Sequence, residues 1–225
     1  MKISDIIKER DTTPSAEEWV GKLKKLETEV TAEMKLNLIK SAQTICPEFK
    51  ITENLKPTLN MLCKYFLGIE GDLDLNKGIF LVGKFGVGKT TIMMAFRRWL
   101  ADNWSQNHQR GNGFMATSIE EIIQDYKMAG NLDKWVDNSN DTFKPGPRHL
   151  LINEFGKNLK DKIYGVDSTQ ITNGLMKLRY ELFQNQGKLT HVTSNYGPGS
   201  EDGALMDRYT EMFNVIEIHG ESLRK

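Results

Sequence analysis

The stretch that decides the fold is GKFGVGKT, residues 83–90. It follows an apolar run, GIFLV at residues 78–82, that is typical of a short buried strand. In the segment after it, Ile92, Phe96 and Trp99 recur at helical spacing. Strand, glycine-rich loop and helix in this order are the context of the phosphate-binding pattern G-x-x-x-x-G-K-[ST]. A glycine-rich turn without a ligand is the alternative.

Each part of this loop suits a bound polyphosphate. Glycine has no Cβ, so the loop can turn tightly and direct its N–H groups inward, and the positive end of the following helix favours an anion. Lys89 can reach the β- and γ-phosphates, and the Thr90 hydroxyl is placed to ligate Mg²⁺. We therefore predict that ATP and Mg²⁺ are the cofactors. The predicted nucleotide-binding residues are Gly83, Lys84, Phe85, Gly86, Val87, Gly88, Lys89, Thr90 and Thr91.

Length and composition set broad limits. A chain of 225 residues can hold one sizeable α/β domain with a small extension. Its 30 basic and 30 acidic side chains cancel, so no bulk charge marks it as a nucleic-acid-binding protein. Cys46 and Cys63 form no C-x-x-C pair, which disfavours a zinc site and fits a reducing compartment. With neither a signal-peptide core nor a membrane-length apolar run, we expect a cytoplasmic protein that does not contact membranes.

The N-terminal region is predicted to be a helical extension. A capping box at residues 15–18 opens a long helix that ends near Cys46, because Pro47 disfavours helical geometry in the residue before it. One apolar stripe follows this helix: Trp19, Leu23, Leu26, Val30, Met34 and Leu38. Periodicity leaves open whether the stripe docks on the chain's own core or on a partner. We expect residues 1–50 to form the extension and residues 51–225 the ATPase domain.

The rest of the chain alternates strands with helices. A second helix is predicted over residues 52–67, with Gly68 as its stop, and a capping box at residues 118–121 opens another. Further strands are predicted at residues 114–117, 149–153, 189–193 and 215–218. A helix between the strands at residues 149–153 and 189–193 carries Ile171, Leu175, Leu178 and Leu182. Residues 133–147 are interpreted as a surface loop. This pattern predicts an α/β fold with a five-stranded parallel sheet between helices.

A second motif follows at RHLLINE, residues 148–154, an apolar strand that ends in Asn153 and Glu154. In nucleotide-hydrolysing enzymes such a strand ends in two acids: the first holds Mg²⁺, usually through water, and the second polarises the attacking water. Here Glu154 is present, but Asn153 brings no negative charge to the metal. We expect binding to survive this change better than hydrolysis, and Asn153→Asp to speed turnover. A strand that ends in Asn-Glu for structural reasons alone is the alternative.

Taken together, these motifs resemble the AAA+ P-loop ATPases of the DnaC-type helicase-loader and IstB-type transposition-helper group over residues 50–225. The resemblance rests on GKFGVGKT (83–90), HLLINEFG (149–156), LTHVTSN (189–195), LMDRY (205–209) and GESLR (220–224). It implies that Asn195 is the sensor-1 residue and Arg224 the sensor-2 arginine. It also implies that Arg208 is an arginine finger that reaches the nucleotide of a neighbouring subunit.

The resemblance implies a nucleotide-driven loader that forms an ATP-dependent homo-oligomer and binds single-stranded DNA. Residues 1–50 would contact a replicative helicase. A transposition helper that delivers a transposase stays open, since nothing inside the chain separates the two. A third alternative is an ATP-binding switch with little hydrolysis, for which Asn153 is the evidence. Two basic groups are candidates for DNA contact, with a solvated face as the alternative: Arg97, Arg98, His108 and Arg110, and Lys157, Lys160 and Lys162.

Overall fold

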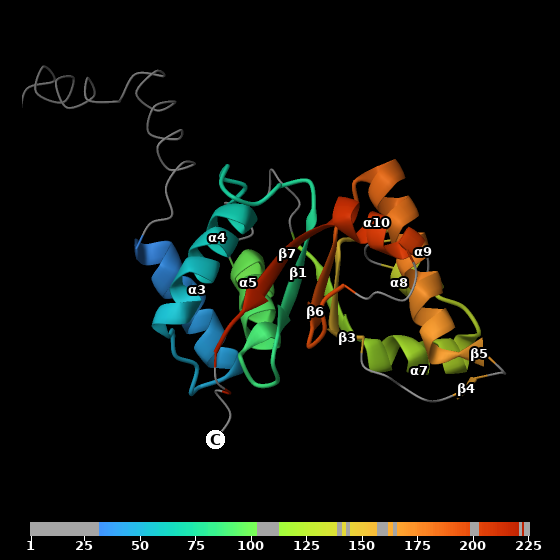
Figure 1. The fold of residues 1–225 in the computed structure, drawn as a ribbon, viewed down its shortest axis with the longest axis horizontal. Helices are drawn as coiled ribbons and strands as arrows, with labels where there is room; N and C mark the ends of the chain where they lie inside the picture. Colours follow the sequence, from blue (N-terminus) through green and yellow to red (C-terminus); the bar gives the residue numbers. More distant parts are fainter. Residues whose placement is uncertain are drawn as a thin grey trace, which may run out of the picture.

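The computed structural model describes residues 32–102, 113–138, 141–142, 145–156, 162–163, 166–198, 203–220 and 222. A five-stranded sheet lies between two layers of helices (Figure 1). Every strand pair in it is parallel, and the strand order is β2-β3-β6-β1-β7. The strands are β1 (Gly78–Gly83), β2 (Met115–Ser118), β3 (Leu150–Phe155), β6 (Thr190–Ser194) and β7 (Phe213–Ile218). The predicted α/β fold with five parallel strands is confirmed.

Alternate residues of β1, which lies between β6 and β7, face the two helical layers, as the two-residue period of a strand requires. Ile79 and Leu81 of β1 join a core with the first layer, whereas Phe80 joins the core of the second. The first layer consists of α3 (Ala32–Ile45), α4 (Lys56–Leu67), which a 3-10 turn at Glu53–Leu55 precedes, and α5 (Lys89–Asp102). The second consists of α7 (Ile119–Ala129), α8 (Asp133–Val136), α9 (Ser168–Gln186) and α10 (Gly203–Met212).

The described part of the predicted N-terminal helix docks on the chain's own core. Leu38 and Ala42 of α3 are buried in the same core cluster as Phe96 of α5, and α3 lies along α5 (Figure 1). The helix ends at Ile45, one residue before the predicted end. The other members of the predicted stripe, from Trp19 to Val30, lie outside the described residues. Within residues 32–45, the question that periodicity left open is therefore decided in favour of the core.

The predicted helix boundaries at Gly68 and Ser118 are confirmed by their capping geometry. Gly68 ends α4 with φ +66°, in the left-handed region that glycine tolerates best. Ser118 begins α7, and its side chain accepts a hydrogen bond from the Glu121 N–H at 3.1 Å. Both signals are local, and tertiary packing leaves them unchanged.

Two predictions about the second layer are wrong. The segment 133–147 is not only a loop, because it contains α8, whose Trp135 side chain is buried. On α9, Leu178 is 36% exposed while the neighbouring Arg179 is 1% exposed, so the inward position belongs to the arginine. A small antiparallel pair, β4 (Lys162–Ile163) with β5 (Val166–Asp167), was not predicted. In the described segments, we find no helix with the length and apolar character that crossing a membrane requires.

Candidate nucleotide-binding site

The predicted phosphate loop connects β1 to α5 at the carboxyl edge of the sheet. Gly86 and Gly88 have φ of +82° and +92°, which side-chain-bearing residues rarely adopt. A Cβ on Gly86 would also lie 2.1 Å from the Ser222 Oγ, so the position excludes a side chain for a second reason. The helix begins directly at Lys89, and the Ile92 N–H donates to the Gly88 carbonyl at 2.9 Å. The N-terminal N–H groups of α5 therefore lie at the end of the loop, where an anion can use them.

Lys89 is buried within the loop and already makes three hydrogen bonds. Its Nζ donates to the Gly83 carbonyl at 2.7 Å, the Lys84 carbonyl at 2.9 Å and the Asn195 Oδ1 at 2.8 Å. An ammonium has three N–H donors, so a phosphate bound by Lys89 replaces at least one of these contacts. The bond to Asn195 joins the phosphate loop directly to the end of β6. Two residues 106 positions apart in sequence are thus brought together.

A single cavity collects most of the predicted site. Because parallel strands end at the same edge of the sheet, the residues that follow β1, β3 and β6 meet there. The predicted residues that line the cavity are Phe85, Gly86, Gly88, Lys89, Thr90, Thr91, Glu154 and Asn195. Val87 instead has its side chain in the core, while Gly83 and Lys84 contribute the carbonyls that Lys89 contacts.

Asn153 lies one residue before Glu154, but its side chain is used within the sheet. Its Nδ2 donates to the Thr117 carbonyl at 3.3 Å, and its Oδ1 accepts from the Thr193 Oγ1 at 3.0 Å. Asn153 is not among the residues that line the cavity. Of the two predicted metal-binding residues, Thr90 therefore faces the cavity and Asn153 does not.

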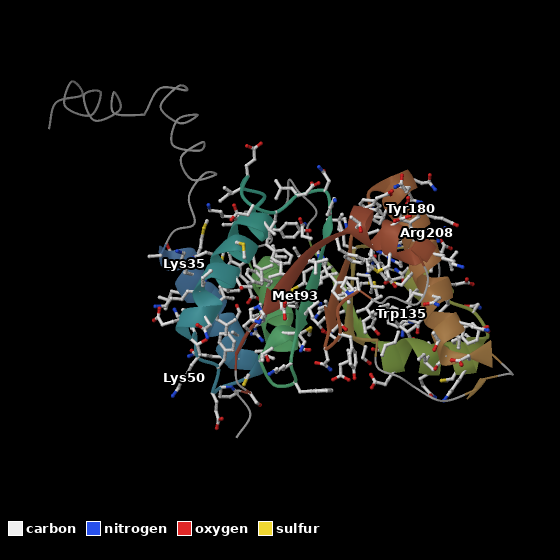
Figure 2. All side chains as sticks on the ribbon, in the orientation of Figure 1. Lys35, Lys50, Met93, Trp135, Tyr180 and Arg208 are labelled. Atoms are coloured by element: carbon white, nitrogen blue, oxygen red, sulfur yellow. The ribbon has the colours of Figure 1, made fainter. Side chains whose placement is uncertain are left out.

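The two predicted arginines have different outcomes. Arg208 on α10 lies away from its own phosphate loop, with its guanidinium carbon 5.2 Å from the centroid of the Tyr180 ring (Figure 2). The Tyr180 hydroxyl donates to Glu211 at 2.6 Å, so an arginine, an aromatic ring and a carboxylate form one surface group. Arg224 lies outside the described residues.

Several residues that line the cavity were not predicted from the sequence. The connection after α3 contributes Cys46, Glu48 and Phe49, and β6 contributes Thr193 and Ser194. Cys46, Glu48 and Phe49 are far from the loop in sequence and match no motif, so no sequence pattern marked them. Thr193 and Ser194 stand beside the predicted Asn195. Their position at the end of a strand in the sheet was the available signal.

The oxygen atoms around the cavity fit a magnesium ion that arrives with a nucleotide. Thr90 and Glu154 supply a hydroxyl and a carboxylate, the hard oxygen donors that Mg²⁺ prefers. In the described segments, no group of three or more His, Cys, Asp or Glu side chains is arranged to hold a metal.

A second cavity lies at the opposite edge of the sheet and is rimmed by basic side chains. Arg148 and Lys188 stand just before β3 and β6, and Arg97 and Arg98 lie near the end of α5. Ion pairs offset part of this charge: Arg148 with Asp141 at 2.6 Å, and Arg98 with Asp102 at 3.5 Å. Of the basic groups predicted from sequence, His108, Arg110, Lys157 and Lys160 lie outside the described residues, as does the side chain of Lys162.

Comparison with known proteins gives structural matches but no sequence-level ones. No family model matches the chain, and no curated protein matches it. Domain III of the Thermotoga maritima replication initiation protein DnaA matches with a TM-score of 0.54 and 16% identity, over 77% of this chain and 65% of that one. The DnaC helicase loader matches with a TM-score of 0.52 and 17% identity, over 76% of this chain and 93% of that one. The fold is that of the AAA+ P-loop ATPases.

A third AAA+ match is AMPPCP-bound DnaA from Aquifex aeolicus, with a TM-score of 0.50 and 16% identity. The match covers 77% of this chain but only 49% of that one, so this chain spans about half of that protein's length. AMPPCP is an ATP analogue, and nucleotide binding is therefore a property found within this fold. At these identities the comparisons establish the AAA+ fold, and the specific activity is argued from the site.

Proposed function

We propose that this chain is a magnesium-dependent ATPase that converts ATP and water to ADP and phosphate. One observation carries the proposal: Lys89, Thr90, Glu154 and Asn195 come from three separate segments and surround one cavity. A phosphate loop alone suggests binding. A carboxylate and an amide placed opposite the loop add the groups that hydrolysis needs.

Each residue has a role that its position supports. The loop amides and Lys89 bind the β- and γ-phosphates, and Thr90 holds Mg²⁺, which neutralises phosphate charge when bound. The Glu154 carboxylate accepts a proton from the attacking water, and Asn195 orients the water or contacts the γ-phosphate. Cys46, Glu48 and Phe49 border the cavity beside Phe85 and provide surface for the rest of the nucleotide.

Two variants test the binding and hydrolysis parts separately. We expect Lys89→Ala to weaken ATP binding at least tenfold in titration calorimetry, because phosphate loses a charge-assisted partner. Glu154→Gln should keep the affinity and lower turnover by about 10²-fold or more. The matched control is Lys177→Ala, an exposed lysine on α9. Undiminished ATP affinity in Lys89→Ala would contradict the proposal.

We further propose that active sites are completed between subunits by Arg208. Its position on α10, away from its own cavity, supports a role toward a neighbouring subunit. Subunits carrying Arg208→Ala and subunits carrying Glu154→Gln should each be inactive alone. Mixing them should restore part of the turnover, because some interfaces then combine an intact carboxylate with an intact arginine. No recovery in mixtures that co-assemble would exclude this role. Arg224 is proposed to act as the sensor-2 arginine.

The function that this machinery best fits is that of a helicase loader that couples nucleotide state to single-stranded DNA. The DnaC helicase loader shares the fold over 93% of its own length, which supports the proposal. Residues 1–50 are proposed to contact a replicative helicase through the part that precedes α3, and residues 51–225 to form the ATPase domain against which α3 packs. Loss of helicase copurification after removal of residues 1–31 would agree with this division, since α3 belongs to the core.

We propose the basic cavity at the far edge of the sheet as the DNA-binding surface. Lys188 and Arg98 rim it from separate segments of the chain, and cations along a groove are the groups that bind a phosphate backbone. Lys188→Gln and Arg98→Gln should each weaken binding of oligo-dT in anisotropy titrations and lower the slope of log K against log salt by about one. Lys177→Gln is the control. Binding that does not depend on salt would exclude this surface.

A switch that binds ATP but hydrolyses little is the second candidate, and Asn153 is the observation that favours it. No acid stands at this position to assist the metal. Single-turnover and steady-state measurements with and without single-stranded DNA separate the two candidates. ATP binding without turnover under every condition would favour the switch.

A further inference from the structure

Glu154 has an unusual backbone conformation for the residue that would act as the base. Its φ is +56°, in the left-handed region where residues other than glycine are uncommon. The register of β3 against β6 shifts between Ile152 and Phe155, so Glu154 sits in an irregularity of the strand. Such a conformation persists when neighbouring contacts hold it. Here a hydrogen bond from the Glu154 N–H to the neighbouring strand β6 supplies such a contact.

Three hydrogen bonds run across three strands to the Glu154 amide. The Glu154 N–H donates to the Thr193 Oγ1 at 3.3 Å, and that hydroxyl donates to the Asn153 Oδ1 at 3.0 Å. The Asn153 Nδ2 donates in turn to the Thr117 carbonyl at 3.3 Å. Thr117, Asn153 and Thr193 are all at most 9% exposed, so water does not readily replace these partners.

The chemistry of the groups determines which one donates and which one accepts in each of these three hydrogen bonds. The Thr117 carbonyl can only accept, so the nitrogen of the Asn153 amide must face it and the oxygen must face Thr193. The Thr193 hydroxyl has one hydrogen, which goes to Asn153, and its lone pair is then available to the Glu154 N–H. Reversing any one member would place two acceptors or two donors together.

We propose that Asn153 and Thr193 are positioning residues, which hold the backbone of Glu154 so that its carboxylate faces the nucleotide cavity. This rests on the proposed ATPase function for its catalytic consequence. The asparagine then replaces the expected aspartate because the site needs an amide. A carboxylate there would place an unprotonated oxygen about 3.3 Å from the Thr117 carbonyl, where both groups accept. The expected effect of Asn153→Asp is therefore the opposite of the one predicted from sequence.

The decisive variants are Thr193→Val, which removes the hydroxyl at nearly constant shape, and Thr193→Ser, which keeps it. We expect Thr193→Val to lower kcat about 10- to 100-fold with KM within about twofold of wild type, and Thr193→Ser to restore most of the rate. Asn153→Asp should lower turnover as well. Faster turnover in Asn153→Asp, or full activity in Thr193→Val, would overturn the proposal.

A second measurement needs no ATP turnover. In the full-length protein with labelled glutamate, amide exchange at Glu154 followed by NMR should accelerate at least tenfold in Thr193→Val and stay near wild type in Thr193→Ser. Unchanged amide exchange at Glu154 in Thr193→Val would overturn the proposal that Thr193 holds the Glu154 backbone. If the wild-type protein hydrolyses no ATP, the proposed ATPase activity fails while this measurement still decides whether Thr193 holds Glu154.

Discussion

The buried side chain of Arg179 links several segments at the amino-terminal edge of the sheet through hydrogen bonds. It is 1% exposed, and burial lowers its pKa to about 10, so it stays charged at neutral pH. Its Nε donates to the Thr190 Oγ1 at 2.9 Å, and its Nη2 donates to the carbonyls of Arg148 and Leu189 at 2.9 and 3.0 Å. Its Nη1 donates to the Trp135 carbonyl at 3.4 Å. One side chain therefore donates to four oxygen atoms from three segments of the chain.

Replacing Arg179 should be costly. Arg179→Met keeps much of the volume but removes the guanidinium that donates to the Thr190 hydroxyl and to the carbonyls of Trp135, Arg148 and Leu189, of which the Leu189 carbonyl keeps the Leu150 N–H. We expect the free energy of unfolding to fall by about 3 kcal/mol or more in urea titrations. Lys177→Met, on an exposed position of the same helix, should change it by less than about 0.5 kcal/mol. Equal stabilities of the two variants would contradict the structural role of Arg179.

Trp135, unlike Arg179, has a buried polar atom that makes no hydrogen bond within the described residues. Its side chain is 5% exposed, and among the described residues its indole N–H has no hydrogen-bond partner. Trp135→Phe keeps most of the apolar surface and removes that unpaired donor, so we expect a loss below about 1 kcal/mol. Trp135→Ala should lose about 3–5 kcal/mol in the same thermal or urea titration, because it opens a cavity. A large loss in Trp135→Phe would show that the N–H has a partner.

At the residue scale, sequence reasoning reached the groups that a local pattern marks. Lys89 and Thr90 follow from the loop pattern, and Glu154 and Asn195 from their positions at strand ends. The use of the Asn153 amide could not be predicted, because it depends on which oxygen atoms of β2 and β6 lie opposite. Those partners are set by strand register, which a single sequence does not reveal.

At the scale of elements, α9 shows where periodicity runs out. Ile171, Leu175 and Leu182 are buried as predicted, but both 178 and 179 satisfy helical spacing between them. Hydrophobicity favours Leu178, whereas the carbonyl groups at the edge of the sheet require a donor, which Arg179 supplies. The helix α8 was missed for another reason. Four residues are too few to show a helical pattern within a polar segment.

The helix α3 offers a test of how packing reaches the site. Leu38 is 6% exposed against α5, whereas Leu36 on the same helix is 50% exposed. The residues that follow α3, including Phe49, line the nucleotide cavity. Leu38→Ala should lower the free energy of unfolding by about 2–3 kcal/mol and weaken ATP binding, because the cavity wall loses its support. Leu36→Ala is the matched control, and similar ATP affinities for the two would separate α3 from the site.

At the scale of the whole molecule, the two edges of the sheet have different chemistry. The carboxyl edge gathers the phosphate loop, Glu154 and Asn195, where a nucleotide is proposed to bind. The amino edge holds the basic cavity and two histidines, the half-buried His149 and the buried His191. The Nδ1 of His149 accepts from the Leu189 N–H at 2.8 Å, and that of His191 from the Ile79 N–H at 3.1 Å. Both rings are therefore needed as neutral acceptors.

These histidines make the stability of the fold depend on pH. Burial lowers the pKa of His149 to about 4, and the nearby cations Lys188 and Arg179 act in the same direction. Burial lowers the pKa of His191 to about 3, with a further lowering from His149 and Arg179. Above pH 6.5 both rings are neutral in the folded and the unfolded chain, so stability does not change with pH on their account. Below it, the unfolded chain binds protons that the folded chain excludes, so stability falls toward pH 4.

We expect the free energy of unfolding in urea to drop between pH 6 and 5 by about 1.4 kcal/mol per pH unit for each histidine. This window lies above the range in which most carboxylates titrate. His191→Asn keeps a hydrogen-bond acceptor without a titrating group, so its profile should be flatter there even if the variant is less stable at pH 7. Leu36→Ala changes an exposed side chain that binds no proton and should keep the wild-type slope. If His191→Asn kept the wild-type slope, the proton binding of His191 would not differ between the folded and the unfolded chain, and this prediction would be wrong.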